Sequence, residues 1–272
     1  MGATSVSLSN VQSVTIGDHT RLIRTWERPE RPWASVLLVH GIAEHSGRYE
    51  LVGRQLAEAG LKVRSFDLPG FGGTGGKRGH IDSFEEYLDA VGDELISSSE
   101  AGLPSVLLGH SLGGLIALTY ALDRTPAPDY LILSAPAIDA NVPAWQRTLA
   151  PLLARIAPKL TIPNPVDGEH LSRDPSVAER YFADPLVYTK ASTRMGAEMF
   201  DAMKAVVGRV PTMPTHIVHG GADELVPAHF SAPLGEKVSR KLYPSLRHEL
   251  FNEPEGPEVI DDIVSWLKEQ IN

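Results

Sequence analysis

Ser111 lies in a pattern typical of a serine nucleophile. It is the central residue of Gly109-His-Ser-Leu-Gly113, and the apolar runs 105–108 and 112–122 on either side predict a strand and a helix. A turn this sharp between a strand and a helix leaves no room for side chains beside the serine, which explains both glycines. The alternative, an ordinary serine in a glycine-rich turn, does not account for the agreement of strand, turn and helix.

A serine hydroxyl needs a base to take its proton, and the base needs an acid that fixes its tautomer. In proteins with this turn the three residues follow in the order serine, acid, histidine. Asp223 follows the predicted strand 215–218, and His248 follows the predicted strand 240–243. We therefore predict a triad of Ser111, Asp223 and His248. The competing acids are Glu224 and Asp139, and the competing bases are His219 and His229.

The negative oxygen of an acyl-transfer intermediate needs hydrogen-bond donors. The amide of Leu112, directly after the nucleophile, is the first predicted donor. The second should come from the loop after the predicted strand 34–39, and Ile42 is our choice. Removing one such interaction raises the barrier by on the order of 3 kcal/mol.

Strands and helices alternate along most of the chain. The expected strands are 34–39, 62–66, 105–108, 130–133, 215–218 and 240–243, and the expected helices are 49–59, 84–97, 112–122 and 257–270. A hairpin of strands 12–16 and 21–27 around the turn 17–20 precedes them. This alternation predicts an α/β fold, with a mostly parallel central sheet and helices on both faces.

The alternation breaks between residues 139 and 210, where seven prolines occur and apolar strands are missing. We interpret 139–210 as a helical cap inserted between the core segments 1–138 and 211–272. Within it, apolar residues recur at helical spacing, and the more common outcome for such a stripe is packing on the core. The alternative is an exposed lid that contacts lipid. The stripe consists of Trp145, Leu149, Leu152, Leu153 and Ile156.

The segment 66–76, FDLPGFGGTGG, matches the glycine spacing of a dinucleotide-binding loop. In such a loop the turn opens directly into a helix that holds the pyrophosphate. Here the capping-box sequence 83–86 starts the next helix well after Gly75. Asp93 and Glu94, about 20 residues on, fall inside that helix. We therefore expect no nucleotide cofactor.

No metal site is expected either. His248-Glu249 begins like a zinc-protease helix, but Asn252 stands where the second histidine ligand belongs. His40 and His45 share one loop, where an orienting hydrogen-bond role is the simpler interpretation.

Composition narrows the class of protein and its partners. The chain has 272 residues, 42% of them apolar, and a net charge of -9, without the basic stripe that nucleic acid requires. The first 20 residues lack signal-peptide features, no apolar run approaches the roughly 20 residues that span a bilayer, and cysteine is absent. We expect a cytoplasmic enzyme, with no obligate protein partner and with peripheral, transient membrane or micelle contact through the cap.

Six segments together resemble the monoacylglycerol lipase family, bacterial type, of the α/β-hydrolase superfamily. They are 40–49 (HGIAEHSGRY), 109–114 (GHSLGG), 133–137 (LSAPA), 172–175 (SRDP), 184–187 (DPLV) and 248–255 (HELFNEPE). The resemblance covers nearly the whole chain. The segment 67–72 departs from it, because Leu68 and Phe71 replace two histidines, and Phe251 stands where some relatives carry a further histidine.

The resemblance implies that a small lipid ester, a monoacylglycerol, is hydrolysed through an acyl-enzyme on Ser111. It also implies that Glu44 and Arg48 bind the glycerol head of the substrate. For these two residues a surface salt bridge is an equally good interpretation. Lysophospholipase and broad short-chain carboxylesterase activities are the alternatives within hydrolases. An acyltransferase or a non-catalytic hydrolase-like binding protein is more remote.

Overall fold

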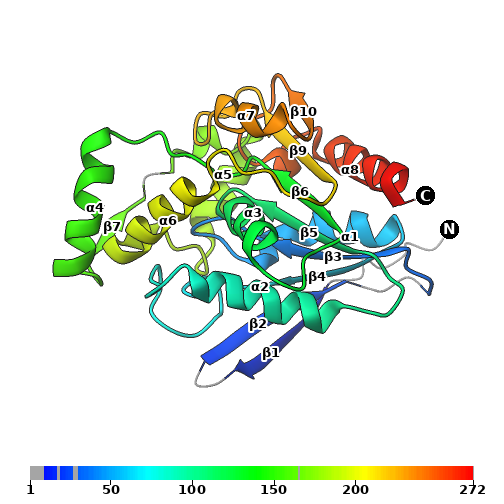
Figure 1. Cartoon of the computed structure of the whole chain (residues 1–272), viewed down its shortest axis with the longest axis horizontal. Helices are drawn as coiled ribbons and strands as arrows, with labels where there is room; N and C mark the ends of the chain where they lie inside the picture. The colour runs from blue at the N-terminus through cyan, green and yellow to red at the C-terminus, as the bar shows by residue number, and fades with distance from the viewer. Residues whose placement is uncertain (1–8, 17–18, 27–29, 165, 272) are drawn as a thin grey trace.

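An eight-stranded sheet forms the centre of the computed structural model, which describes residues 9–16, 19–26, 30–164 and 166–271. The strand order is β1-β2-β4-β3-β5-β6-β9-β10 (Figure 1). The strands are β1 (Asn10–Ile16), β2 (His19–Thr25), β3 (Ala34–Val39), β4 (Leu61–Phe66), β5 (Ser105–His110), β6 (Tyr130–Ser134), β9 (Thr215–Gly220) and β10 (Ser239–Tyr243). Residues 17, 18 and 27 of the predicted hairpin lie outside the described residues.

Neighbouring strands from β4 through to β10 are parallel, whereas β1 and β2 add an antiparallel hairpin at one edge. All six residues of β3 are buried. Strands covered on both faces read as continuous apolar runs, which is why 34–39 and 105–108 show no polar alternation. The predicted mostly parallel sheet is confirmed.

Helices cover both faces of the sheet. Alternate residues of a strand point to opposite faces. Leu37 and Val39 therefore pack in one apolar cluster with α2 (Glu85–Ser98) and α3 (Leu112–Asp123). Val36 and Leu38, on the opposite face, pack in a second cluster with α1 (Glu50–Glu58) and α8 (Gly256–Ile271). The shorter helices are η1 (Ser46–Tyr49), η3 (Ala228–Ser231), α7 (Ala232–Gly235) and η4 (Leu250–Asn252).

The chain between β6 and β9 is mostly helical, as expected. It contains α4 (Ala144–Ile156), β7 (Thr161–Pro163), η2 (Gly168–His170), α5 (Pro175–Ala183), β8 (Lys190–Ser192) and α6 (Thr193–Val206). The antiparallel pair of β7 and β8 was not predicted, because each strand has only three residues. The helix α6 joins the core, since Met195, Met203 and Val206 are buried in the cluster of α2 and α3. None of the helices in the described part of the chain has the length and hydropathy to cross a bilayer.

The apolar stripe of α4 does not pack on the core, so that preferred interpretation is wrong. The exposed fractions are 61% for Trp145, 42% for Leu149, 52% for Leu152 and 72% for Ile156. The helix lies against α6, and among the side chains described on α4 the small Ala154 is the buried one. Figure 1 shows α4 at the end of the molecule, away from the sheet. The helix therefore meets its neighbour through a small side chain and presents the larger apolar ones to solvent.

The helix after the glycine-rich loop starts where its capping sequence predicts. The side chain of Glu86 accepts a hydrogen bond from the Ser83 amide (3.2 Å), and Ser83 Oγ accepts one from the Glu85 amide (3.3 Å). These bonds satisfy amides that the first turn of a helix leaves free. The helix therefore begins at Glu85, ten residues after Gly75.

The glycine-rich loop folds around one carboxylate of its own. Asp67 accepts hydrogen bonds from the amides of Ser46 and Gly73, both at 2.8 Å. A Cβ atom at Gly72 would lie 2.2 Å from Asp67 Oδ2, so only glycine fits there. The glycine at position 72 therefore makes room for the buried side chain of Asp67, and this side chain occupies the centre of the loop.

Candidate active site

Ser111 sits at the carboxyl end of β5, in the turn that begins α3. Its backbone has φ 54° and ψ −117°, a conformation that costs a non-glycine residue free energy. A Cβ atom at Gly109 would lie 2.1 Å from the carbonyl oxygen of Gly113, and one at Gly113 would lie 2.2 Å from that of Val39. The glycines on both sides are therefore required by close backbone contact, as the sequence predicts.

The structure brings Ser111, His248 and Asp223 into one chain of hydrogen bonds. Nε2 of His248 lies 3.0 Å from Oγ of Ser111, and Nδ1 of His248 lies 2.7 Å from Oδ2 of Asp223. All three side chains are buried. They come from loops after β5, β9 and β10, whose carboxyl ends meet at the same edge of the parallel sheet.

Asp223 is held ionised. Its Oδ1 accepts hydrogen bonds from the amides of Leu225 (2.9 Å) and Val226 (2.8 Å). Burial raises the pKa of Asp223, but the charge of His248 and the bonds from His219, His248 and Val226 outweigh burial and hold that pKa well below its usual range. An ionised Asp223 accepts the Nδ1 proton of His248, so that Nε2 is free to accept from the serine.

A second histidine, His110, lies beside the base, with ring centroids 4.9 Å apart. Burial, followed by the nearby His248, lowers the pKa of His110 to about 3. A neutral His110, which bonds Ser134 Oγ at 3.1 Å, adds no charge beside a base that becomes positive during proton transfer. The sequence analysis did not assign His110 a role, although it is the second residue of the nucleophile pattern.

Ile42 and Leu112, the predicted oxyanion donors, belong to turns that adjoin Ser111: Leu112 follows it directly, and a Cβ atom at Gly41, the residue before Ile42, would lie 3.2 Å from Ser111 Cβ. Leu112 is the first residue of α3, and the first amides of a helix have no acceptor within it. Ile42 follows the buried end of β3, between Gly41 and Ala43. The amide of Gly41 donates to Glu44 Oε1 (2.6 Å), and Ala43 has the left-handed φ of 70°. This loop therefore has a fixed shape next to the serine.

Glu44 and Arg48 form a buried ionic cluster with Glu249, so the interpretation as a surface salt bridge is wrong. Their side chains are 6%, 10% and 6% exposed, respectively. Arg48 Nη1 donates to Glu44 Oε2 (2.9 Å). Arg48 also donates to both oxygens of Glu249, at 2.6 and 2.8 Å. A cavity of about 10 Å³, about the size of one water molecule, lies between this cluster, His110 and Asn252.

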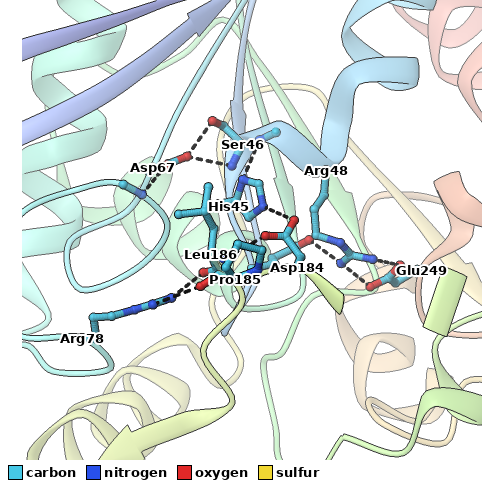
Figure 2. Close-up of polar contacts among 12 residues, drawn as sticks. His45, Ser46, Arg48, Asp67, Arg78, Asp184, Pro185, Leu186 and Glu249 are labelled. Atoms are coloured by element: carbon cyan, nitrogen blue, oxygen red, sulfur yellow. Dashed lines mark hydrogen bonds and ion pairs between the residues drawn. The ribbon is translucent and has the colours of Figure 1, made fainter. Parts of the chain in front are cut away.

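The segment 184–188, called the strap below, fastens the chain between α5 and β8 to the loops at the site. His45 Nε2 lies 2.9 Å from Asp184 Oδ2, and Arg78 donates to the carbonyl oxygens of Pro185 (3.2 Å) and Leu186 (2.6 Å) (Figure 2). The amide of Tyr188 donates to the carbonyl of Ala43 (2.8 Å). Because Gly47 donates to Nδ1 of His45, the imidazole proton is placed on Nε2, towards Asp184.

The competing residues have other partners. Glu224 has a 71% exposed side chain and pairs with His170 at 3.3 Å. His219 Nδ1 bonds Ser231 Oγ (2.8 Å), and its Nε2 lies 3.4 Å from Asp223 Oδ2, so His219 contacts the acid of the triad. His229 lies against the ring of Phe230. Asp139 pairs with Arg147.

The histidines considered for a metal are also engaged elsewhere. His40 bonds the carbonyl of Gly41 (2.7 Å) and accepts from the amide of Leu68 (2.9 Å). Within the described ranges, no group of three or more histidine, aspartate or glutamate side chains converges as a metal site would require.

Comparison with known proteins agrees with this geometry. The family model described as serine aminopeptidase, S33, matches residues 30–255. A monoacylglycerol lipase of Mycolicibacterium smegmatis is 35% identical over 261 residues, which cover 89% of this chain and 90% of that protein. A phospholipase of Bacillus subtilis is 32% identical over 248 residues, which cover 86% and 95%.

Solved structures give the same result. The crystal structure of a monoacylglycerol lipase from Paleococcus ferrophilus matches with a TM-score of 0.82 at 35% identity, over 90% of this chain and 97% of that chain. The monoglyceride lipase of Saccharomyces cerevisiae, solved with a substrate analogue, matches in fold with a TM-score of 0.87 at 22% identity, over 98% and 97%. The chain therefore belongs to the α/β-hydrolases of the serine aminopeptidase S33 family, and the predicted resemblance to monoacylglycerol lipases is confirmed.

Proposed function

We propose that this protein hydrolyses the ester bond of monoacylglycerols to a fatty acid and glycerol. The single observation that carries the proposal is the hydrogen-bonded chain of Ser111, His248 and Asp223, in a protein 35% identical to a monoacylglycerol lipase. Oγ of Ser111 attacks the ester carbonyl while Nε2 of His248 takes its proton. The amides of Ile42 and Leu112 stabilise the oxyanion. His248 then protonates the departing glycerol, and water releases the acyl group by the same steps.

Glu44 and Arg48 are the residues that we propose bind the polar glycerol head of the substrate. Both line the small cavity beside His110, which has room for one hydroxyl group of a glycerol head, and their charged side chains can hydrogen-bond such a hydroxyl. A head-group role predicts that KM for a monoacylglycerol depends on these residues more than KM for a simple ester does.

The experiment that tests the function is fatty-acid release from monoacylglycerols of increasing chain length, compared with lysophosphatidylcholine and triacylglycerol. Preferential release from monoacylglycerols supports the proposal. Faster release from lysophosphatidylcholine would instead favour a lysophospholipase, a candidate supported by the 32% identical phospholipase of Bacillus subtilis. Failure of a serine-directed fluorophosphonate to label Ser111 would favour a non-catalytic binding protein.

The acidic limb of the pH profile offers a separate prediction. Burial lowers the pKa of His248, but the charge and hydrogen bond of Asp223, then Glu249 and Glu44, outweigh burial and raise that pKa above 6.5; the neighbouring His110 stays neutral. Protonated His248 cannot accept the serine proton. We therefore expect kcat/KM for an uncharged soluble ester to rise with pH, with a midpoint above 6.5. A midpoint at or below 6.5 would contradict this assignment.

His248 makes stability depend on pH in the opposite direction from activity. A pKa raised by folding means that the folded state holds the proton more tightly than the unfolded chain does. The resulting stabilisation is fully present below pH 6.5 and is lost as the pH rises through the folded pKa. The free energy of unfolding due to this group therefore falls over the range in which activity rises.

We also propose that residues 139–210 act as a cap whose helix α4 touches the surface of a membrane or micelle. Its exposed side chains Trp145, Leu152 and Ile156 form an apolar face on the part of the molecule farthest from the sheet (Figure 1). Such a contact would bring the site to substrates dissolved in lipid.

Replacing Trp145, Leu152 and Ile156 together with serine is expected to lower binding to phosphatidylcholine vesicles by about tenfold or more. Burial of one large apolar side chain contributes about 1.5 kcal/mol or more, and about 1.4 kcal/mol corresponds to a factor of ten. Vesicle co-sedimentation measures the effect. The control is Leu51→Ser, which removes an equally exposed side chain (59%) from α1. Equal binding of the triple variant and wild type would exclude α4 as the contact.

A further inference from the structure

The base and the oxyanion loop are joined by a continuous chain of buried charges. Glu249 directly follows His248. Its two carboxylate oxygens accept hydrogen bonds from the two terminal nitrogens of Arg48, at 2.6 and 2.8 Å (Figure 2). Arg48 lies 201 residues away in sequence, beside the loop that contains Ile42. A two-point contact of this kind fixes the orientation of both groups as well as their separation.

The other end of the chain reaches the backbone of the oxyanion loop. Arg48 donates to Glu44, and Glu44 Oε1 accepts from the Gly41 amide and from the Tyr49 hydroxyl, both at 2.6 Å. The amide next along the chain is that of Ile42. A series of hydrogen bonds thus runs from the residue after the base to the residue before the oxyanion donor.

Contacts from the region between β6 and β9 close the third side of this cluster. The ring of Tyr181 lies 4.7 Å from the guanidinium carbon of Arg48. The amide of Glu249 donates to the carbonyl of Leu171 (2.8 Å). Tyr181 and Leu171 pack in one apolar cluster with Ala43, the residue after Ile42. The guanidinium therefore contacts the residue after the base (Glu249), the loop that contains Ile42 (through Glu44) and α5 (through Tyr181).

Two buried carboxylates around one guanidinium are a costly way to stabilise a fold. Desolvation of each ion offsets the attraction between them, and apolar residues of similar volume often stabilise a protein as well or better. The cluster does, however, fix the distance between the loop of His248 and the loop of Ile42, because each of its hydrogen bonds has a preferred length and direction. Hydrolysis depends on such distances, since a misplacement of about 1 Å at a catalytic group can cost on the order of 100-fold in rate.

We propose that Arg48 and Glu249 are positioning residues that hold Nε2 of His248 and the amide of Ile42 at the separation which the tetrahedral intermediate requires. The proposal rests on the proposed ester hydrolysis and adds Glu249 to the residues that serve it. It differs from head-group binding by Arg48, because a positioning role affects every ester, including one without a glycerol head.

The test compares Arg48→Met and Glu249→Gln with wild type on p-nitrophenyl butyrate and on a monoacylglycerol. For Arg48→Met we expect kcat to fall about 100-fold on both esters, with KM for p-nitrophenyl butyrate unchanged. For Glu249→Gln we expect a loss of roughly tenfold, because the amide keeps one acceptor oxygen for the guanidinium. Fluorophosphonate labelling of Ser111 should slow in parallel, since it uses the same base.

The matched control is Arg209→Met. Arg209 also pairs with a carboxylate through both terminal nitrogens, at 2.6 and 3.0 Å from Asp123, but it lies on the surface, with a side chain 39% exposed. Its kcat should equal that of wild type. Thermal unfolding of all three variants shows whether they fold; if Arg48→Met does not, the nearly isosteric Glu249→Gln decides the question alone.

Two results would overturn the proposal. One is an unchanged kcat of folded Glu249→Gln on p-nitrophenyl butyrate. The other is a folded Arg48→Met that only raises KM for the monoacylglycerol, which would assign Arg48 to head-group binding. Failure of the proposed function looks different: wild type would cleave p-nitrophenyl butyrate but no monoacylglycerol, and the variants could still be compared on the first ester.

Discussion

Ser111→Ala is expected to lower kcat for monoacylglycerol hydrolysis by about four orders of magnitude or more. The variant loses the oxygen that lies 3.0 Å from His248 Nε2 and would form the acyl-enzyme. The fold should persist, because the methyl group fits where the serine side chain was. The measurement is titration of released fatty acid over a series of monoacylglycerols, together with fluorophosphonate labelling of the same samples.

The control for this variant is Ser99→Ala, which removes an exposed hydroxyl bonded only to the carbonyl of Ile96 among the described residues. Its activity should match that of wild type. If Ser111→Ala kept even a hundredth of wild-type turnover, Ser111 would not be the nucleophile, and the assignment of His248 and Asp223 would fall with it.

Asp223→Asn is expected to lower kcat by about 10⁴-fold while leaving the fold intact. The carboxylate accepts the Nδ1 proton of His248 at 2.7 Å, and its other oxygen is held by the amides of Leu225 and Val226. An asparagine that keeps the backbone bonds through its oxygen turns its NH₂ group towards His248. The imidazole then carries its proton on Nε2 and cannot accept one from Ser111. Steady-state kinetics and thermal unfolding measure the two parts of this prediction.

The matched control is the neighbouring carboxylate, in the variant Glu224→Gln. This residue competes with Asp223 for the role of acid on sequence grounds, but it is exposed and pairs with His170. A loss of activity in Glu224→Gln comparable to that in Asp223→Asn would show that the acid has been assigned to the wrong residue.

The strands of the sheet could be predicted because short stretches of sequence determine each of them. The buried run 34–39 and the turn after 105–108 each determine their own structure, and parallel strands need continuous apolar sequence. The meeting of Ser111, Asp223 and His248 could also be predicted, because each follows a predicted strand and the carboxyl ends of parallel strands meet at one edge of a sheet. The structure places His248 within hydrogen-bond distance of both Ser111 and Asp223.

What could not be predicted depends on contacts between distant segments. The hydrogen bond from Arg48 to Glu249 joins residues 201 positions apart. The sequence offers one indication of it, which is that the acidic residue Glu249 directly follows the predicted base His248. The strap likewise meets His45 and Arg78 through tertiary contacts alone. The stripe of α4 has the periodicity of a buried helix, but periodicity does not tell which neighbour, or which solvent, the apolar side meets.

Three residues with left-handed backbone carry a further consequence. Ala43, Ser111 and Ala135 have φ values of 70°, 54° and 41°, and each follows a central strand, β3, β5 or β6. Each such residue costs on the order of 1–2 kcal/mol, a notable share of a typical net stability of about 5–15 kcal/mol. The packing of the two apolar clusters, which extend from the site over both faces of the sheet, must offset that strain. Evolution towards faster turnover would therefore act on the strained edge of the sheet, and evolution towards heat resistance would act on the parts of the apolar clusters away from that edge.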